Sequence, residues 1–254
     1  AETEQLSKLV THDPGLAAQV ISWANSPYYG VSGSISNINE AVVRVLGFDL
    51  VINLALGLSL GRTLSVPKEG PQGYIPFWQQ SVYTAALMAE LVRALPPESR
   101  PSQGMAYLCG LLHNFGYLIL AHVFPPHFQL VNRHIEANPQ INRYYIEQHL
   151  LQLTREQISG NLFKHWGIPE DVCCAIRYQN EPSYDGEHSV LSRLLYVATR
   201  MLRQHNLSDA PLETIPEELI AELNIDQGKA DIALEKVLDA QDELQEMARL
   251  LKNG

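Results

Sequence analysis

Cysteine is scarce in this sequence, with three residues among 254. Cys109, Cys173 and Cys174 make an odd count, and the adjacent pair is poor geometry for a disulfide framework. The pattern therefore does not indicate a disulfide-stabilised secreted protein, and we predict a reducing, cytoplasmic location. No secretory signal can be read at the start of the sequence. Residue 1 is Ala rather than Met, so we expect a fragment of a longer protein.

Basic charge is also scarce. The sequence has 18 Lys and Arg residues against 28 Asp and Glu residues, which gives a formal net charge of -10. Proteins that bind nucleic acids gain much of their affinity from clustered Lys and Arg side chains that neutralise phosphates. No run of basic residues occurs here, so a nucleic-acid-binding regulator is the least favoured of our functional hypotheses.

Long hydrophobic runs, low-complexity segments and internal repeats are absent from the sequence. The longest apolar run, residues 50–64, is interrupted by Asn53, Ser59 and Arg62. It is shorter than the ~20 residues that a membrane-spanning helix needs. We therefore predict no membrane span and no membrane partner.

Apolar residues recur instead at three- and four-residue intervals, and no alternation typical of β-strands occurs. The sequence therefore predicts an all-α fold. Helix-capping signals support it: Asp13-Pro14 is expected to begin one helix, and Thr154 with Gln157 forms a capping box. Asp226 is expected to cap one long final helix that packs against the rest of the domain.

Two further signals divide the early helices. Asn37 is expected to cap a helix that Gly47 closes, and Asp49 is expected to cap the next one. The segment 65–76 contains three prolines and two glycines, which favour irregular structure. We therefore divide the chain into an N-terminal helical part (1–64), an exposed linker (65–76), a helical core (77–205) and C-terminal helices (206–254).

The stretch MAYLCGLLHNFGYLILAHV, residues 105–123, predicts a central helix with one broad apolar stripe. Glycine disfavours a helix by about 1 kcal/mol relative to alanine. Gly110 and Gly116 therefore suggest that neighbouring backbone comes close to this helix. The polar pair His113-Asn114 lies in its middle and is the candidate for function.

The motifs DPGLAAQVISWANSPYYG, INEAVVRVLG, YLCGLLHNFGYLIL and LFKHWGIPEDVCCAI follow one another in that order. In this the chain resembles the HDOD family, bacterial output domains related to the HD-domain metal phosphohydrolases. The resemblance extends from about residue 5 to residue 203 and implies a multi-helical HD-like fold. The family-motif positions to which we assign structural roles are Asp13, Pro14, Asn25, Ser26, Gly47, Gly116, Trp166 and Pro169.

Active HD enzymes hold a divalent metal with a His, a His-Asp pair and a further Asp. In this chain the resemblance places Gln80 at the first position, His113 and Asn114 at the pair, and Thr199 at the last. Further histidines of related members correspond to Arg155, Gln179 and Asn180. A hard dication needs anionic oxygens or several imidazoles, so we interpret these positions as vestigial and predict no metal, no cofactor and no catalytic residue.

The other polar candidates have simpler structural explanations. Six of the nine histidines lie between His113 and His165, but their spacing does not match a zinc site. The cysteines are ordinary small core residues. Asn25 and Ser26 lie at a predicted helix end, where their side chains can satisfy backbone groups.

The resemblance implies a non-catalytic signal-transduction output or interaction module. Its partners would be proteins of a signalling pathway, including a receiver domain that is fused to it or separate. The leading alternative is a metal-dependent phosphohydrolase that acts on nucleotides or cyclic dinucleotides. Bound metal at His113 would distinguish the two hypotheses.

Overall fold

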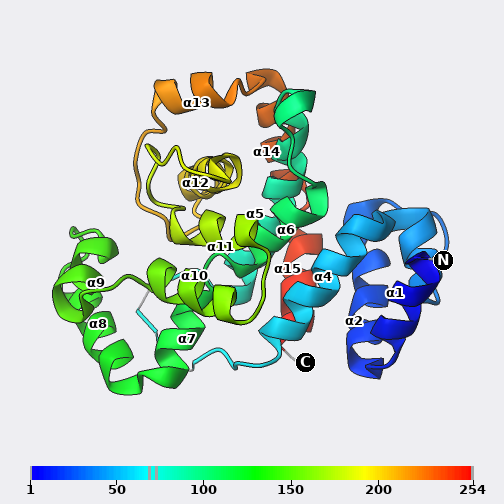
Figure 1. Ribbon diagram of the computed structural model, residues 1–254, viewed down its shortest axis with the longest axis horizontal. Coiled ribbons are helices and arrows are strands. Elements are labelled where there is room, and N and C mark those ends of the chain that lie inside the picture. Colours follow the sequence, from blue (N-terminus) through cyan, green and yellow to red (C-terminus); the bar gives the residue numbers. More distant parts are fainter. Residues whose placement is uncertain (1, 68–69, 72–73, 253–254) are drawn as a thin grey trace.

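The computed structural model describes residues 2–67, 70–71 and 74–252, and within them the protein is all-α, without a strand, as predicted (Figure 1). The α-helices are α1 (Glu2–Thr11), α2 (Pro14–Ala24), α3 (Ile38–Glu40), α4 (Gly47–Gly61), α5 (Phe77–Leu91), α6 (Gln103–Leu112), α7 (Phe115–Val123), α8 (Pro125–Ala137), α9 (Arg143–Leu151), α10 (Arg155–His165), α11 (Glu170–Arg177), α12 (Ser189–Gln204), α13 (Glu217–Leu223), α14 (Gln227–Asp239) and α15 (Gln241–Lys252). Four shorter elements are the 3-10 helices η1 (Pro27–Tyr29), η3 (Val92–Ala94) and η4 (Pro97–Ser99) and the π-helical η2 (Ala41–Leu46).

The N-terminal helices form one end of the molecule, and α4 leads from them into the centre (Figure 1). Asp13 caps α2 as predicted, because its side chain accepts a hydrogen bond from Leu16 N. Gly47 closes η2 as predicted, because its φ of 79° is left-handed rather than helical and its N–H donates to Val42 O. Helix α4 follows without an intervening loop, and the expectation that Asp49 caps it is wrong, since no side chain makes a capping bond at its start. Asp49 lies within α4, where its carboxylate accepts hydrogen bonds from Gly104 N and Ser102 Oγ and so joins α4 to the start of α6.

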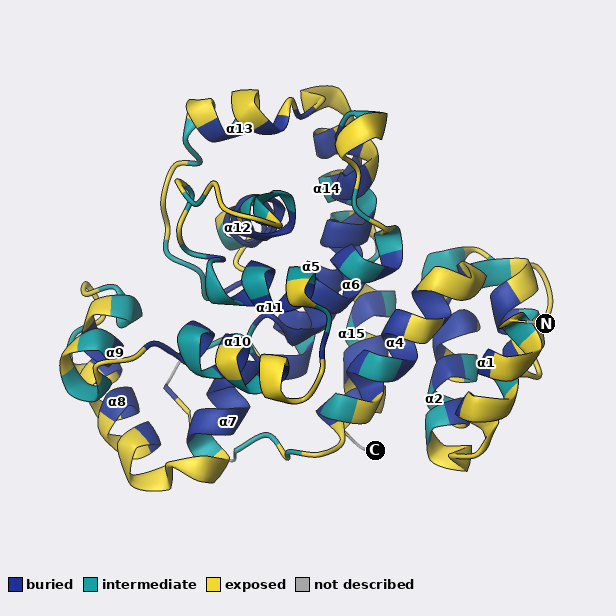
Figure 2. Cartoon of the chain, viewed as in Figure 1, coloured by how far each residue is buried: buried dark blue, intermediate teal, exposed yellow. Residues whose placement is uncertain are grey.

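Helices α5 and α6 occupy the centre of the fold (Figure 2), where most of their residues are buried. The close backbone approach that the sequence predicts at Gly110 is confirmed. A Cβ at this position would lie 2.5 Å from Cα of Ala85 on α5, so only glycine allows the two helices to pack this closely.

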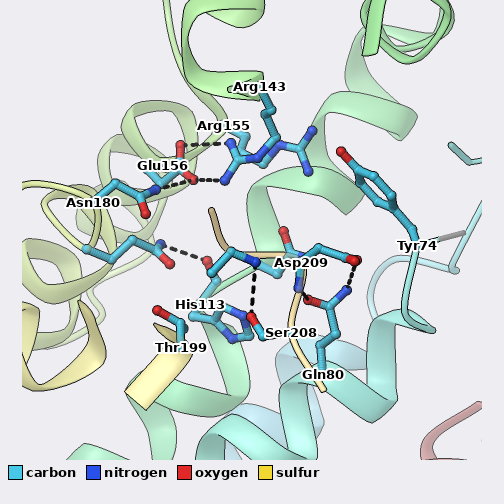
Figure 3. Close-up of a pocket in the computed structure, with 13 residues that line it drawn as sticks. Tyr74, Gln80, His113, Arg143, Arg155, Glu156, Asn180, Thr199, Ser208 and Asp209 are labelled. Carbon is cyan, nitrogen blue, oxygen red and sulfur yellow. Dashed lines mark hydrogen bonds and ion pairs between the residues drawn. The ribbon is translucent and has the colours of Figure 1, made fainter. Parts of the chain in front are cut away.

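The predicted central helix is in fact two helices. The helix ends at Leu112, His113 and Asn114 form a turn, and α7 starts at Phe115. The apolar stripe is the same on both sides of the turn, so hydrophobic periodicity did not reveal the break. The turn places the His113-Asn114 pair where segments from several distant parts of the chain converge (Figure 3).

The predicted single C-terminal helix is likewise divided, between α14 and α15 at Ala240. Asp226 caps α14 as predicted, by accepting from Lys229 N. Tyr83 on α5 donates a hydrogen bond to Gln241 O, and buried residues of α15 join the main apolar core. That core extends from Leu6 to Leu251 and includes both sides of the proposed linker. The domain boundaries remain a prediction, and residues 68–69 and 72–73 of the linker lie outside the described residues.

Two helical stretches within the described residues are long and apolar enough, by length and composition alone, to cross a membrane: Ile38–Gly61 and Gln103–Val123. This evidence is weak, because core helices of globular proteins have the same composition. Of the most apolar windows, 56% of the first and 83% of the second is buried inside the protein. The predicted location and the absence of a membrane partner remain predictions.

Candidate functional site

A small cavity of about 30 Å³ lies beside the turn between α6 and α7. A cavity of this size accommodates one or two water-sized groups rather than an organic molecule. It is lined by all four positions that the sequence aligned with the HD ligands and by the three secondary positions, namely Gln80, His113, Asn114, Thr199, Arg155, Gln179 and Asn180. We call it the His113 pocket (Figure 3). Residues that are far apart in the sequence therefore do meet at one site.

His113 is neutral in this environment. Its Nδ1 lies 2.7 Å from Gly110 O, and because a carbonyl only accepts, Nδ1 carries the proton. Burial lowers the pKa of His113 to about 4, since desolvation penalises the charged imidazolium. The backbone carbonyl of His113 in turn accepts from Gln179 Nε2 at 2.9 Å. The histidine is thus held by its own helix and by the residue at one of the secondary positions.

Gln80 is fully engaged with Asp209, which lies in the loop after α12. Gln80 Nε2 donates to Asp209 Oδ2 at 2.5 Å and to Ile75 O at 2.9 Å, and Gln80 Oε1 accepts from Asp209 N at 3.0 Å. Ile75 N also donates to Asp209 Oδ2, at 3.0 Å. Both ends of the Gln80 amide are therefore used in joining the start of α5 to this loop.

Thr199 has partners as well. Its hydroxyl donates to Leu195 O at 2.9 Å within α12 and accepts from Arg200 Nη1 at 3.2 Å. Asn114 precedes α7 and makes no side-chain capping bond there. Asn180 Nδ2 donates to Glu156 Oε1 at 3.0 Å. Of the four aligned positions, only His113 keeps a strong metal-ligating atom, the unprotonated Nε2.

Four charged side chains, three of them buried and one partly exposed, form a cluster beside the pocket (Figure 3 labels three of them). We call Arg143, Glu147, Arg155 and Glu156 the four-charge cluster. Arg143 bridges both carboxylates, at 3.2 Å from Glu147 and 2.5 Å from Glu156, and Arg155 Nε lies 2.6 Å from Glu147. Burial raises the pKa of Glu156, but the Arg143 guanidinium outweighs it, so the net pKa lies below its usual value. Glu156 is therefore charged near neutral pH.

The donor set does not fit a divalent metal ion. Within the described residues, no group of three or more His, Cys, Asp or Glu side chains lies at a spacing that could hold one. The Glu156 carboxylate is already paired with Arg143, and the Asp209 carboxylate accepts from Ile75 and Gln80. Neutral amide and hydroxyl groups do not compensate the charge of a dication.

Sequence reasoning missed several residues of this site. Asp209 lies 129 residues from Gln80, in a loop without a motif, and no sequence signal indicates it. Arg143 and Glu147 are four residues apart on α9, a spacing that is visible in the sequence but usually marks an exposed ion pair. Glu156 lies inside the Thr154 capping box, which explained its segment by local structure alone.

The family-motif positions outside the pocket make local structural contacts. Asn25 donates to Ile35 O and accepts from Ile35 N, both at 2.8 Å, and thereby joins the end of α2 to the following loop. Ser26 accepts from Tyr28 N at the start of η1. Trp166 packs its ring against Phe163 at the end of α10, with centroids 5.9 Å apart. Pro169 directly precedes α11.

Two more expectations concern glycine and the cysteines. A Cβ at Gly116 would lie 2.2 Å from Arg155 O, which confirms the predicted close backbone approach. Cys109 and Cys173 are buried, Cys174 is partly buried, and all three are free in the described structure. Burial raises the pKa of the Cys109 thiol well above its usual value, so this residue is unreactive.

The comparisons with known proteins agree on the fold. The HDOD domain family matches residues 1–182. A solved structure of a protein assigned to signal transduction, from Marinobacter aquaeolei VT8, is 44% identical with a TM-score of 0.87, over 97% of this chain and 54% of that one. A protein of Shewanella amazonensis SB2B assigned as a phosphohydrolase is 23% identical with a TM-score of 0.75, over 98% of this chain and 87% of that one, and this likeness shows the fold alone.

An uncharacterised protein of Treponema pallidum (strain Nichols) is 26% identical over 215 residues, which are 84% of this chain and 40% of that protein. The chain thus spans less than half of this curated relative and about half of the Marinobacter protein. The family match covers well over half of the chain, and the motifs and helical architecture agree with it. This chain belongs to the HDOD family.

Proposed function

We propose that this domain is a non-catalytic output or interaction module of bacterial signal transduction. One observation carries the proposal: the polar groups at the aligned HD positions bond mainly to the protein itself. The Gln80 amide is hydrogen-bonded to Asp209, and the Thr199 hydroxyl is hydrogen-bonded to its own helix and to Arg200. Among the aligned positions, His113 alone retains a strong metal-ligating atom, and a single imidazole does not hold a divalent ion with useful affinity.

The chemistry of phosphoester hydrolysis supports the same proposal. A metal lowers the pKa of its bound water enough to supply hydroxide near neutral pH only when several ligands fix its geometry. A metal-independent route would need a general base with a pKa near 7. His113 is a weak base in this environment, because burial lowers its pKa to about 4.

The name of one solved relative supports a signalling role. The Marinobacter protein is assigned to signal transduction, and it extends well beyond the part that matches this chain. We therefore propose that this domain works with another domain, a sensory or receiver domain, on the same polypeptide or on a partner protein.

A domain without chemistry acts through contact, and the protein exposes apolar side chains suited to that. Phe48 and Ile52 are four residues apart on α4, so they lie on the same face of the helix, and they are 37% and 41% exposed. Val43 on the preceding η2 is 70% exposed. Exposed apolar groups of this kind are typical of interaction surfaces when they are contiguous.

The test is elemental analysis and a phosphoesterase assay on the protein purified without chelators. We expect no stoichiometric manganese, iron or zinc and no hydrolysis of phosphomonoesters, nucleotides or cyclic dinucleotides. The variant Gln80→His/Asn114→Asp/Thr199→Asp restores the aligned HD ligands and is therefore the positive control for metal binding. It also removes the hydrogen bonds from Gln80 to Asp209. One metal ion per wild-type chain that is lost on His113→Ala would contradict the proposal and support a metal-dependent phosphohydrolase.

A further inference from the structure

We infer that Arg155 is the resident cation of the His113 pocket. Its guanidinium supplies, from within the chain, the positive charge that a metal ion supplies in related HD hydrolases. The inference rests on the proposed function, since a pocket that held a dication would not need a second fixed cation. It explains why the pocket keeps buried carboxylates although its ligand set does not fit a metal.

The backbone brings Arg155 directly to the His113-Asn114 turn. Arg155 is the first residue of α10, and Thr154 fixes the start of this helix with a complete capping box. The carbonyl of Arg155 packs against Gly116 on α7, where a Cβ would lie 2.2 Å from the oxygen. The start of α10 is thus held against the first turn of α7, two residues after Asn114.

Three of the four charged side chains are buried and Arg143 is 20% exposed, so the charges of the cluster must balance. Glu147 is 0% exposed, Arg155 3% and Glu156 4%. Glu147 accepts from Arg155 Nε at 2.6 Å and from Arg155 N at 2.9 Å. With Arg143, the cluster has two positive and two negative charges. Loss of Arg155 would leave one buried negative charge without compensation, which is strongly unfavourable.

The charge of Arg155 also acts on two other residues that line the pocket. Burial raises the pKa of Asp209 to about 6, and this rise is opposed first by the hydrogen bonds from Ile75 N and Gln80 and then by the charges of Arg203 and Arg155. Burial likewise raises the pKa of Tyr74, and Arg155 is the strongest group opposing it. Arg155, Asp209 and Tyr74 all line the His113 pocket (Figure 3).

Beyond its bonds to Glu147, the Arg155 guanidinium makes a contact that depends on its charge. Its Nη2 is buried without a hydrogen-bond partner among the described residues. Its guanidinium lies 5.3 Å from the centre of the Tyr117 ring, a contact that suits a cation.

Substitutions in the full chain separate charge from shape. Arg155→Met keeps much of the side-chain volume but removes the charge, and we expect it to lower Tm by roughly 6–20 °C. Arg155→Lys keeps the charge and should restore at least half of that loss. Glu147→Gln/Arg155→Met removes one charge of each sign and should be more stable than Arg155→Met, a comparison that holds even if the single variant does not fold.

Chemical rescue tests the cation directly. Arg155→Ala leaves space for a small guanidinium ion, so methylguanidinium should bind there and stabilise the variant. Each tenfold increase in concentration above the dissociation constant should raise Tm by about 3–5 °C. Wild type and Ile176→Ala, which opens an uncharged cavity at a fully buried residue, should gain nothing from methylguanidinium relative to sodium chloride at the same ionic strength.

Each result bears on one idea. Three results would overturn the inference that Arg155 is the resident cation. Arg155→Met could be as stable as the wild type, or the double variant could be no more stable than Arg155→Met. Methylguanidinium could also rescue Ile176→Ala as well as it rescues Arg155→Ala. Stoichiometric metal in the wild type would overturn the proposed function instead. If the wild type is metal-free and Arg155→Met is as stable as the wild type, the proposed function stands and only the inference about Arg155 is overturned.

Discussion

Gly116→Ala is the substitution for which the structure gives the sharpest expectation. The added Cβ would lie 2.2 Å from Arg155 O and 2.7 Å from Arg155 C. Both are backbone atoms, so no side-chain rotation relieves the overlap. The backbones of α7 and α10 would have to separate by about 1.2 Å, the difference between 2.2 Å and the 3.4 Å at which ordinary contact begins.

Two effects of opposite sign set the magnitude. Overpacking in a close-packed interior costs about 1–3 kcal/mol and occasionally more, and this overlap of backbone atoms is severe. Alanine gains up to ~1 kcal/mol over glycine in a helix. Separation of α10 from α7 also displaces Arg155 from Glu147, which now lies 2.6 Å from it. We therefore expect a net loss of about 2–3 kcal/mol of unfolding free energy and a fall in Tm of roughly 4–12 °C.

The assay is urea and thermal unfolding followed by circular dichroism, with Gly228→Ala as the matched control. Gly228 lies near the start of α14, and its added Cβ would meet only Asp226 Oδ1, at 3.5 Å. That variant should be neutral or slightly stabilised. If Gly116→Ala unfolds at the same denaturant concentration as Gly228→Ala, the close contact between α7 and α10 does not exist and the placement of Arg155 is wrong.

Three other predictions follow from the same region. Burial raises the pKa of Asp209 from 3.8 to about 6. Between these pH values the folded state binds more protons than the unfolded state, so the unfolding free energy falls as pH rises. Asp209→Asn should abolish up to about 3 kcal/mol of this pH dependence in urea titrations from pH 4 to 7, and an unchanged pH profile would refute the shift. Glu147→Gln leaves the buried Arg155 under-compensated and should destabilise the protein by about 3–5 kcal/mol in urea unfolding, whereas a loss below 1 kcal/mol would mean that the cluster is solvated. Thr154→Ala removes the cap of α10 and should cost about 1 kcal/mol by the same measurement, and a gain in stability would show that the cap does not form.

The sequence by itself determined the helical class, the family and much of the local structure. Helical periodicity, Asp13 and Asp226 as caps and the Thr154 capping box depend on interactions between residues a few positions apart, which a linear pattern records. The motif order identified the family without any long-range contact. The alignment of HD positions also placed the right residues in one pocket, because the family resemblance carries tertiary information that periodicity lacks.

Only the tertiary structure decided how that pocket is filled. The break at His113-Asn114 does not disturb the apolar stripe, and the partner of Gln80 lies in a loop 129 residues away. Glu147 and Arg155 look like surface charges in the sequence, since charged residues are usually exposed. The fold buries them because opposite charges from α9 and α10 meet beside the α7 turn, and the energy of a buried charge depends on its neighbours in space rather than on its neighbours in the chain.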